Sequence, residues 1–591
     1  MRRLSRLGVA ALLAAWSAGT AFAGTRVGDV EVTAIESPYG DVDHGYVEYR
    51  FHVRNFGARS HGVTLEGPEK PETQRWMGLR SVSRHADVGP ASTAVISILQ
   101  PAFGVLGDGL SIVLDSGERG TMPFAFASQL YGGGGGPHQR VLLSRGVSLD
   151  DAKRLLEPPA PIGPTASYGG PTHVALFAFS RPELPVGEWQ AGWLGYGSYD
   201  GVVMTGDELA LAPGAVSTAL HQYVEAGGTL GVIGTFERPA SWREGKGRDG
   251  IRSFHGGFGQ AISLPAPLDP HHGTAGEAIR EACARTRAAL QRQGGSQANV
   301  LFPVVEKVGT PVRSLFVVML LFAVAIGPMN LYVLSRLKRK ILIFLTIPAI
   351  SVGTAVVVTI YSFLSEGWQR HARTECLTLL DEAAHRATTI GWTAFYSTLT
   401  PGDGLLFSSD TELTYVASQG TDVYGSSRAL TLDWSAGQHL GKGWLQARIP
   451  THFQVRKSEA RRERVPISRN ADGGFAATNG LGVDISELWF ADATGAVFHA
   501  TGVGAGSRAV LRRDPTRRAG GHFESTRTLF VSAWVGLADR LAKTPESHLS
   551  PGEYLAVVKR TPFLEDGLAK LSQRHGSSVV LGRAAEGPDA R

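Results

Sequence analysis

Two uncharged apolar runs near the middle of the chain constrain its fold more than any other feature. Residues 314–335 and 341–365 contain no Asp, Glu, Lys or Arg. Each has the roughly 20 residues that a helix rising 1.5 Å per residue needs to cross a bilayer core about 30 Å thick. Four of the five residues between them, 336–340, are Lys or Arg. Because short basic loops stay in the cytoplasm, we predict transmembrane helices over 314–335 and 341–364, a cytoplasmic loop over 336–340 and two exported flanks.

The apolar runs also contain helix breakers and one amide. Gly327-Pro328 falls in the first run and Pro348 in the second, and membrane helices tolerate such kinks where neighbours satisfy the freed carbonyl. In lipid the amide of Asn330 needs a polar partner, which the other helix can supply. Two interpretations stay open for Asn330: a transport or signalling element, or a hydrogen bond that locks the helix pair.

The N-terminus indicates the same topology. A basic start, MRRLSR, precedes the apolar LGVAALLAAW and the small-x-small pattern Ala21-Phe22-Ala23, which predicts a signal peptide over 1–23; an uncleaved anchor is the alternative. The predicted localisation is the bacterial inner (cytoplasmic) membrane, with both large domains on the periplasmic side.

The first exported flank begins with strand patterns. The sequence VEYRFHV at 47–53 alternates apolar and polar residues, and 61–68, 92–101 and 109–117 continue the pattern between turn residues. Such spacing predicts a β-sandwich over 24–130. The run YGGGGGP at 131–137 then predicts a flexible linker.

Strands and helices alternate after the linker, which predicts a parallel sheet with covered faces over 138–262. The segment YDGVVMTGDELALAPGAVSTALHQYVEAGGTLGVIGTFERP resembles the class I glutamine amidotransferase-like, flavodoxin-like domain found in exported parts of bacterial membrane proteins and in accessory proteins of gliding-type ABC transporters. The resemblance implies a nucleophilic Cys at the turn after TLGVIG and a downstream His-x-Glu. This chain has Ile233-Gly234-Thr235 at that turn, and its His-x-Glu, 522–524, lies far downstream.

Thr235 is the one hydroxyl at the position of the missing nucleophile. A threonine needs a positioned base, and His255 or Glu237 could serve as one. The alternative, which we favour, is a degenerate domain that binds without catalysis.

Two further clusters imitate metal sites without matching a known ligand spacing. One is His271-His272 with Glu277 or Glu281, read as a solvated loop before a helix; the other is Asp381-Glu382 with His385, read as the polar face of a helix. We therefore predict no catalytic, cofactor-binding or metal-binding residue and no cofactor.

The two cysteines, Cys283 and Cys376, exclude a disulfide framework. They are either a single disulfide or two unrelated buried thiols. The net charge of +5 is small for 591 residues, and the cations are scattered, so we expect no nucleic-acid partner.

The predicted fold class is a multidomain α+β membrane protein: a β-sandwich, a flavodoxin-like α/β domain, a two-helix transmembrane hairpin and a second β-sandwich-like domain. The remaining boundaries follow from composition and periodicity. They are a helical connector at 263–313 with its helix at 274–293, a β-rich exported domain at 365–530, and an α/β tail at 531–591 with a disordered end.

The whole layout, with GPMNLYVLSRLKRK and Ile347-Pro348, resembles a group of bacterial two-span membrane proteins to which no reaction is assigned. We expect a non-catalytic, membrane-anchored cell-envelope protein whose exported domains bind a protein partner or a glycan, as an accessory subunit of an ABC-type export complex. The alternative is an exported hydrolase with an unrecognised active site in the α/β domain.

Overall fold

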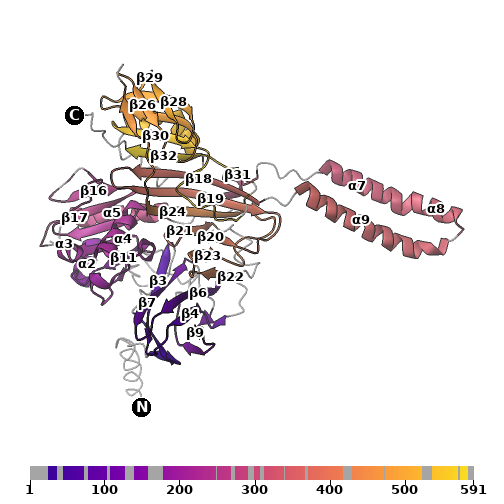
Figure 1. Cartoon of the computed structure of the whole chain (residues 1–591), viewed down its shortest axis with the longest axis horizontal. Coiled ribbons are helices and arrows are strands. Elements are labelled where there is room, and N and C mark those ends of the chain that lie inside the picture. The colour runs from indigo at the N-terminus through magenta and orange to yellow at the C-terminus, as the bar shows by residue number, and fades with distance from the viewer. Residues whose placement is uncertain are drawn as a thin grey trace, which may run out of the picture.

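The computed structural model describes residues 24–35, 44–71, 78–102, 105, 107–126, 139–157, 177–245, 247, 249–267, 273–290, 298–305, 312–338, 340–366, 370–416, 429–470, 473–521, 536–569, 571 and 573–583. The expected signal peptide, linker and disordered end lie outside these residues, as do His271-His272 and the motif at 522–524. The described part is a body of several β-sheets from which a pair of helices projects (Figure 1).

Two sheets form the N-terminal region. The strand predicted at 47–53 is confirmed, with Val47, Tyr49, Phe51 and Val53 buried. The first sheet has the order β1 (Thr25–Val27), β2 (Val30–Ala34), β3 (Tyr46–Asn55), β7 (Thr93–Pro101). The second begins with β10 (Arg119–Met122), β9 (Leu110–Leu114), β4 (His61–Gly67), β6 (Gly78–Val88), and a short pair consists of β5 (Lys70–Pro71) and β8 (Gly107–Asp108). The facing apolar side chains of both sheets belong to one core.

A mainly parallel sheet follows, as the alternating pattern predicts. Its order is β12 (Phe177–Ser180), β11 (Gln139–Leu143), β13 (Gly201–Thr205), β14 (Thr229–Ile233), β17 (Gly259–Leu264), and then the antiparallel β16 (Arg252–Gly256) and β15 (Arg243–Glu244). Numbered in chain order, the five parallel strands run 2-1-3-4-5.

Helices cover both faces of this sheet. One of the helices expected to alternate with the strands is α4 (Gly214–Glu225), which buries Leu220 and Tyr223 and ends before Gly227, whose φ is +110°. The opposite face is covered by α2 (Leu149–Leu156) and α5 (Gly273–Leu290). The apolar face predicted at 274–293 is confirmed in α5, but the helix packs on β13 and β14 rather than connecting two domains. The expected boundary at 262 is therefore wrong, because α5 completes the core of the α/β layer.

The sheet after the helix pair has twelve strands, more than any other sheet in the described residues, and we call it the long sheet. Its order is β21 (Thr411–Val416), β24 (Thr451–Ala460), β19 (Arg386–Ser397), β18 (Arg370–Asp381), β32 (Ser578–Arg583), β30 (Glu553–Val558), β27 (Ile485–Ala491), β28 (Ala496–Val503), β29 (Arg508–Arg518), β26 (Phe475–Thr478), β25 (Ile467–Arg469), with β31 (Gln573–His575) paired to β18. The strands β30 and β32 lie inside this sheet, so the expected separate tail at 531–591 is wrong for its described part. The shorter elements are α3 (Gly206–Ala210), α6 (Ala298–Leu301), α11 (Leu537–Lys543), η1 (Val186–Glu188), η2 (Trp193–Tyr196) and η5 (Pro545–Ser547).

Chain segments from before and after the helix pair share a sheet. The N-terminal sheet continues from β6 into β22 (Ala429–Asp433), β23 (Gln438–Leu440) and β20 (Leu405–Phe407). Thr431 lies opposite Ser81 in the parallel β6–β22 register. The expected independent domain at 365–530 is wrong for these strands, because Leu430 and Leu432 enter the N-terminal core.

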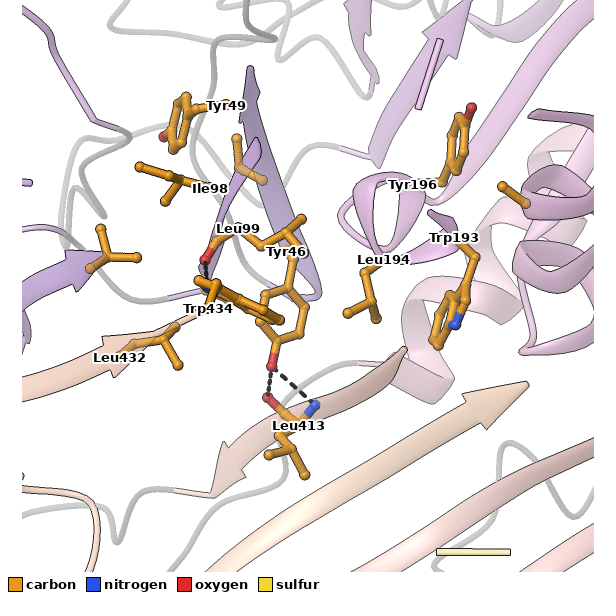
Figure 2. Packing of buried hydrophobic residues seen from close by; sticks show 14 of the residues in the cluster. Tyr46, Tyr49, Ile98, Leu99, Trp193, Leu194, Tyr196, Leu413, Leu432 and Trp434 are labelled. Carbon is orange, nitrogen blue, oxygen red and sulfur yellow. Dashed lines mark hydrogen bonds between the residues drawn. The ribbon is translucent and has the colours of Figure 1, made fainter. Parts of the chain in front are cut away.

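Buried polar contacts tie the same two parts together. Trp434 Nε1 donates to the Leu99 carbonyl at 2.8 Å, and the Leu413 N–H donates to the Tyr46 hydroxyl at 3.2 Å. Figure 2 shows these contacts beside Trp193, Leu194 and Tyr196 of η2. The α/β layer, the N-terminal sheets and the β21 edge therefore meet in one core.

The projecting helices are long and apolar enough to cross a membrane. The first consists of α7 (Val312–Val324), the π-helical turn η3 (Ala325–Met329) and α8 (Asn330–Arg336); the second of η4 (Lys340–Leu342) and α9 (Ile343–Glu366). Gly327 and Pro328 lie in η3, where the expected local distortion is found. Asn330 Nδ2 donates to Thr346 Oγ1 at 2.9 Å, which confirms the predicted bond between the two helices.

Candidate binding cleft between the α/β sheet and the long sheet

The carboxyl edge of a parallel sheet is where α/β folds place their ligands, and here that edge is closed by its own side chains. Glu208 lies between the ends of β11 and β13. Its carboxylate accepts hydrogen bonds from the Ser144 hydroxyl, from the Gly146 N–H at 2.8 Å and from the Thr205 hydroxyl at 2.8 Å. Burial alone would raise the pKa of Glu208, but these donors hold it below its ordinary value. Ser144 is fully buried, so this network stabilises the loops and leaves no accessible nucleophile on Ser144.

The structure does not bring Thr235 and His255 together. Thr235 follows the carboxyl end of β14, whereas the β14–β17 and β17–β16 registers place His255 level with Thr229, through Gln260, at the amino end. The four residue steps from Thr229 to Ile233 already span about 13 Å of strand. Thr235 and Glu237 are exposed, and neither side chain hydrogen-bonds to a residue that the structure describes. The geometry therefore gives Thr235 no base.

The cluster Asp381-Glu382-His385 is a turn and not the predicted helix face. Asp381 lies opposite Arg386 in the backbone register at the end of the β18–β19 hairpin. Its carboxylate accepts hydrogen bonds from the Ala383 and Ala384 N–H groups at 3.1 and 2.9 Å. Glu382 is buried and accepts from the Val465 N–H and the Tyr554 hydroxyl. No group of three or more His, Cys, Asp or Glu among the described residues could hold a metal ion. Glu277 and Glu281 lie on the exposed face of α5.

The two cysteines are separate buried thiols, one of the two alternatives that the sequence left open. Cys283 lies on α5 against Gly201, where an added Cβ would come within 2.6 Å of its sulfur. Cys376 lies on β18 beside the Ser578 hydroxyl, 3.2 Å from its sulfur. Burial raises the pKa of both thiols, which disfavours the reactive thiolate form.

A cleft of about 590 Å³ opens between the α/β layer and the long sheet. This volume lies within the range of small-molecule pockets. One wall consists of the α4 end, residues 239–243 and His255, and the other consists of the β18–β19 turn with strands β30 and β32. The cleft thus brings together two residues singled out in the sequence: His255, which precedes the helix pair in the chain, and Asp381, which follows it.

Glu225 is the buried acid of this cleft. Its carboxylate accepts from Arg386 Nη1 at 3.1 Å, from the Ser458 hydroxyl at 3.1 Å and from Trp242 Nε1 at 3.4 Å. Burial raises the pKa of Glu225, with the charge of Arg386 acting in the opposite direction. The acid is therefore held in place by residues from before the helix pair (Trp242) and from after it (Arg386 and Ser458). We call these two parts the halves of the chain.

A second ion pair lies across the same cleft. Arg243 of β15 donates to the Glu553 carboxylate of β30. In each pair, one partner comes from the α/β layer and the other from the long sheet, so the cleft's charges are largely neutralised inside its own walls. Such an arrangement can hold a polar, uncharged group without leaving a buried ion unpaired.

Sequence reasoning missed Glu225, Arg243, Arg386 and Glu553. The members of the two pairs are 161 and 310 residues apart, and local patterns carry no information over such separations. One local signal was present: Glu225 occupies the last turn of α4, where the helix dipole disfavours an anion. An acid at that position indicates a compensating cation elsewhere in the fold.

Comparison with known proteins adds no family. No family model matches the chain, and no curated protein matches it. Among solved structures, the chain is similar to a copper-bound PCuAC domain from PmoF2, with 13% identity over 18% of this chain and 97% of that domain, at a TM-score of 0.14. At that TM-score the likeness supports no conclusion about this chain.

Proposed function

We propose that the protein is a non-catalytic, membrane-anchored component of the bacterial cell envelope, whose folded body lies outside the inner membrane and binds a partner there. The proposal includes a two-helix membrane hairpin with a cytoplasmic basic loop and a flavodoxin-like, amidotransferase-related domain without its nucleophile. In this proposal the partner is a protein of an ABC-type export complex.

The pairing of β6 with β22 is the observation that carries the proposal. These strands come from before and after the apolar helices, and strands of one sheet must lie on one side of a membrane. If both helices cross a bilayer, they therefore cross it as a hairpin. The apolar side chains that the helices expose, such as Phe344 at 83% and Ile341 at 82%, need a non-aqueous environment.

The α/β layer supports the proposed fold resemblance through its strand order, and a binding role over catalysis through its carboxyl edge. The 2-1-3-4-5 strand order is that of flavodoxin-like sheets, in agreement with the resemblance seen in the sequence. At its carboxyl edge, Glu208 is occupied by internal donors and Thr235 lacks a base. The cleft lined by Glu225 and Arg386 offers a more suitable surface for a partner.

Cysteine accessibility tests the topology. Ser335→Cys, at the basic loop, should be labelled by a membrane-impermeant maleimide only after lysis. Leu211→Cys is the matched control, because Leu211 is 84% exposed on the body and should be labelled in intact spheroplasts. The native thiols are buried and give little background. Labelling of Ser335→Cys in intact spheroplasts would refute the proposed orientation.

Purification from detergent tests the binding role. Mild solubilisation followed by mass spectrometry should recover a stable envelope partner, and recovery should fall in an Arg386→Ala, Arg243→Ala variant that alters the cleft. A protein that is reproducibly recovered alone would contradict the proposal.

A further inference from the structure

A second concave surface lies on the outer face of the N-terminal sheet, away from the cleft described above. It encloses about 500 Å³ and is lined by polar side chains from β4, β6, β9, β10 and β22. We call it the outer groove. Its polar residues are exposed or half-buried, while the neighbouring positions Leu65, Val82 and Ile112 point into the core. Alternation along β4 and β9 therefore places Glu66 and Ser111 on the groove side, while on β6 the register shift at Arg80 lets both Arg80 and Ser81 line the groove.

The polar side chains cross five strands, with one diagonal step between β6 and β4, where Glu66 lies opposite Ser83 and reaches Ser81 through a side-chain hydrogen bond. Thr431 lies opposite Ser81, Glu66 opposite Ser111, and Ser111 opposite Thr121. Two hydroxyls orient the carboxylates at their sides: Ser81 donates to Glu66 at 2.7 Å, and Thr121 donates to Glu69 at 2.7 Å. A row of preoriented donors and acceptors is more than the scattered polarity of an ordinary solvated sheet face.

Two arginines add donors to this row. Arg80 and Arg119 line the groove, and neither forms an ion pair with a residue that the structure describes. Each guanidinium carries five N–H donors in a rigid fork, whereas a carboxylate only accepts. The groove can therefore donate to and accept from the same ligand along its whole length.

The chemistry of the row selects one class of ligand. Two arginines balance two glutamates, which gives a polyanion little net attraction. The lining has neither the aromatic nor the large apolar side chains that anchor a lipid or an apolar peptide segment. A chain of hydroxyl groups, each both donor and acceptor, matches the alternating carboxylates, hydroxyls and guanidinium groups.

The dimensions agree with a linear polymer. Neighbouring strands are about 4.8 Å apart, so the five-strand row spans about 19 Å. One hexopyranose unit of an extended chain is close to one strand spacing in length, so several units would lie across the strands. We propose that the outer groove binds an uncharged, polyhydroxylated glycan chain. The inference rests on the proposed function for its cell-envelope setting.

Binding by the full chain in detergent micelles tests this inference. The probes are chitohexaose and cellohexaose, which are uncharged, and hexagalacturonate, which is acidic, titrated by calorimetry. At least one uncharged hexamer should bind saturably and more tightly than the acid. The double variant Glu66→Ala, Thr121→Ala should weaken that binding by at least about tenfold, since it removes a charged acceptor and the hydroxyl that orients Glu69.

The control is Glu118→Ala, an exposed acid on the same sheet region outside the groove, which should leave the affinity unchanged. Far-ultraviolet circular dichroism and the unfolding midpoint verify that each variant is folded. The inference is overturned if none of the three hexamers binds, if the acid binds at least as tightly as both uncharged hexamers, or if the double variant binds normally. Because these residues lie outside the cleft and the helix pair, the topology and co-purification results should be the same for wild type and double variant. A failure here is thus distinct from a failure of the proposed function.

Discussion

The two halves of the chain meet in two regions with opposite chemistry. In the helix pair, the apolar helices α7 and α8 lie against α9, and the one hydrogen bond between the described side chains of the two helices joins Asn330 to Thr346. In the body, the halves are joined by two partly buried ion pairs, by the buried Arg456 guanidinium on the Ala226 carbonyl, by a hydroxyl and by an indole. The difference shows that the helix pair is held together with little polar specificity, whereas the body depends on matched polar and charged groups away from water.

The largest effect is expected from the ion pair at the centre of the body. Arg456 donates to both Glu412 oxygens, at 3.0 and 2.5 Å, and to the Ala226 carbonyl of the first half at 3.0 Å. Both ionic side chains are almost fully buried. Glu412→Ala leaves a buried guanidinium unpaired and should lower the free energy of unfolding by about 3–5 kcal/mol.

Urea unfolding in detergent micelles, followed by tryptophan fluorescence, measures this loss. The matched control is Glu281→Ala on α5, which removes the exposed i,i+4 pair with Arg285 and should cost less than about 0.5 kcal/mol. Equal losses in the two variants would show that the body does not depend on buried charge pairing.

The second largest loss in the free energy of unfolding is expected from removing the Tyr46 hydroxyl, which joins the two halves of the chain. The Tyr46 hydroxyl accepts from the Leu413 N–H and from the Gln438 side-chain amide. Tyr46→Phe leaves two buried donors without an acceptor and should cost about 1–3 kcal/mol in the same unfolding experiment. Tyr49→Phe, whose hydroxyl bonds Gln100 within the first half at 2.9 Å, should cost less; a larger cost for Tyr49→Phe would contradict the role of Tyr46 in joining the halves.

Stability should also depend on pH through His221 of α4. Burial, and then the charge of Arg386 from the other half, lower the pKa of His221 from 6.5 to about 4. Between pH 6.5 and pH 4 the imidazole is protonated in the unfolded chain but stays neutral in the folded protein. The free energy of unfolding is therefore greatest above pH 6.5 and falls as the pH approaches 4. Because part of the ring is exposed, we expect this loss to be about 1–2 kcal/mol.

Unfolding midpoints at pH 7 and pH 4 check the sign. His221→Gln should make the difference between the two midpoints smaller than in the wild type. His52→Gln, on the exposed side of β3, controls for the loss of a histidine and should leave the difference as it is. A pH 7 to pH 4 difference in His221→Gln as large as that of the wild type would be inconsistent with this assignment.

The smallest effect belongs to the helix pair. A double-mutant cycle of Asn330→Ala and Thr346→Ala should give a coupling of about 0.6 kcal/mol, typical of hydrogen bonds between membrane helices. Thr359→Ala is the control, because the hydrogen bond that its hydroxyl donates goes to the Ala355 carbonyl of its own helix. A coupling above that of Glu412 with Arg456 would reverse the comparison between the two regions.

The sequence by itself determined the local elements of this protein. The two apolar helices, the strand at 47–53 and the helices α4 and α5 are confirmed, because period and composition act over neighbouring residues. The spacing of Asp381 to His385 misled the same reasoning, since four residues fit a helix turn as well as a hairpin turn. The pairing of β18 with β19 along their full length decided between them.

Only the tertiary structure decided how the halves combine. The parallel register between Ser81 and Thr431, the pairing of Glu225 with Arg386, and the row of hydroxyls across the outer groove all join residues far apart in the chain. Strand order and buried ion pairing depend on which surfaces are brought together on folding, and no local pattern specifies them. For that reason, the sequence divides the chain into successive domains, while the folded body is assembled from both flanks of the helix pair.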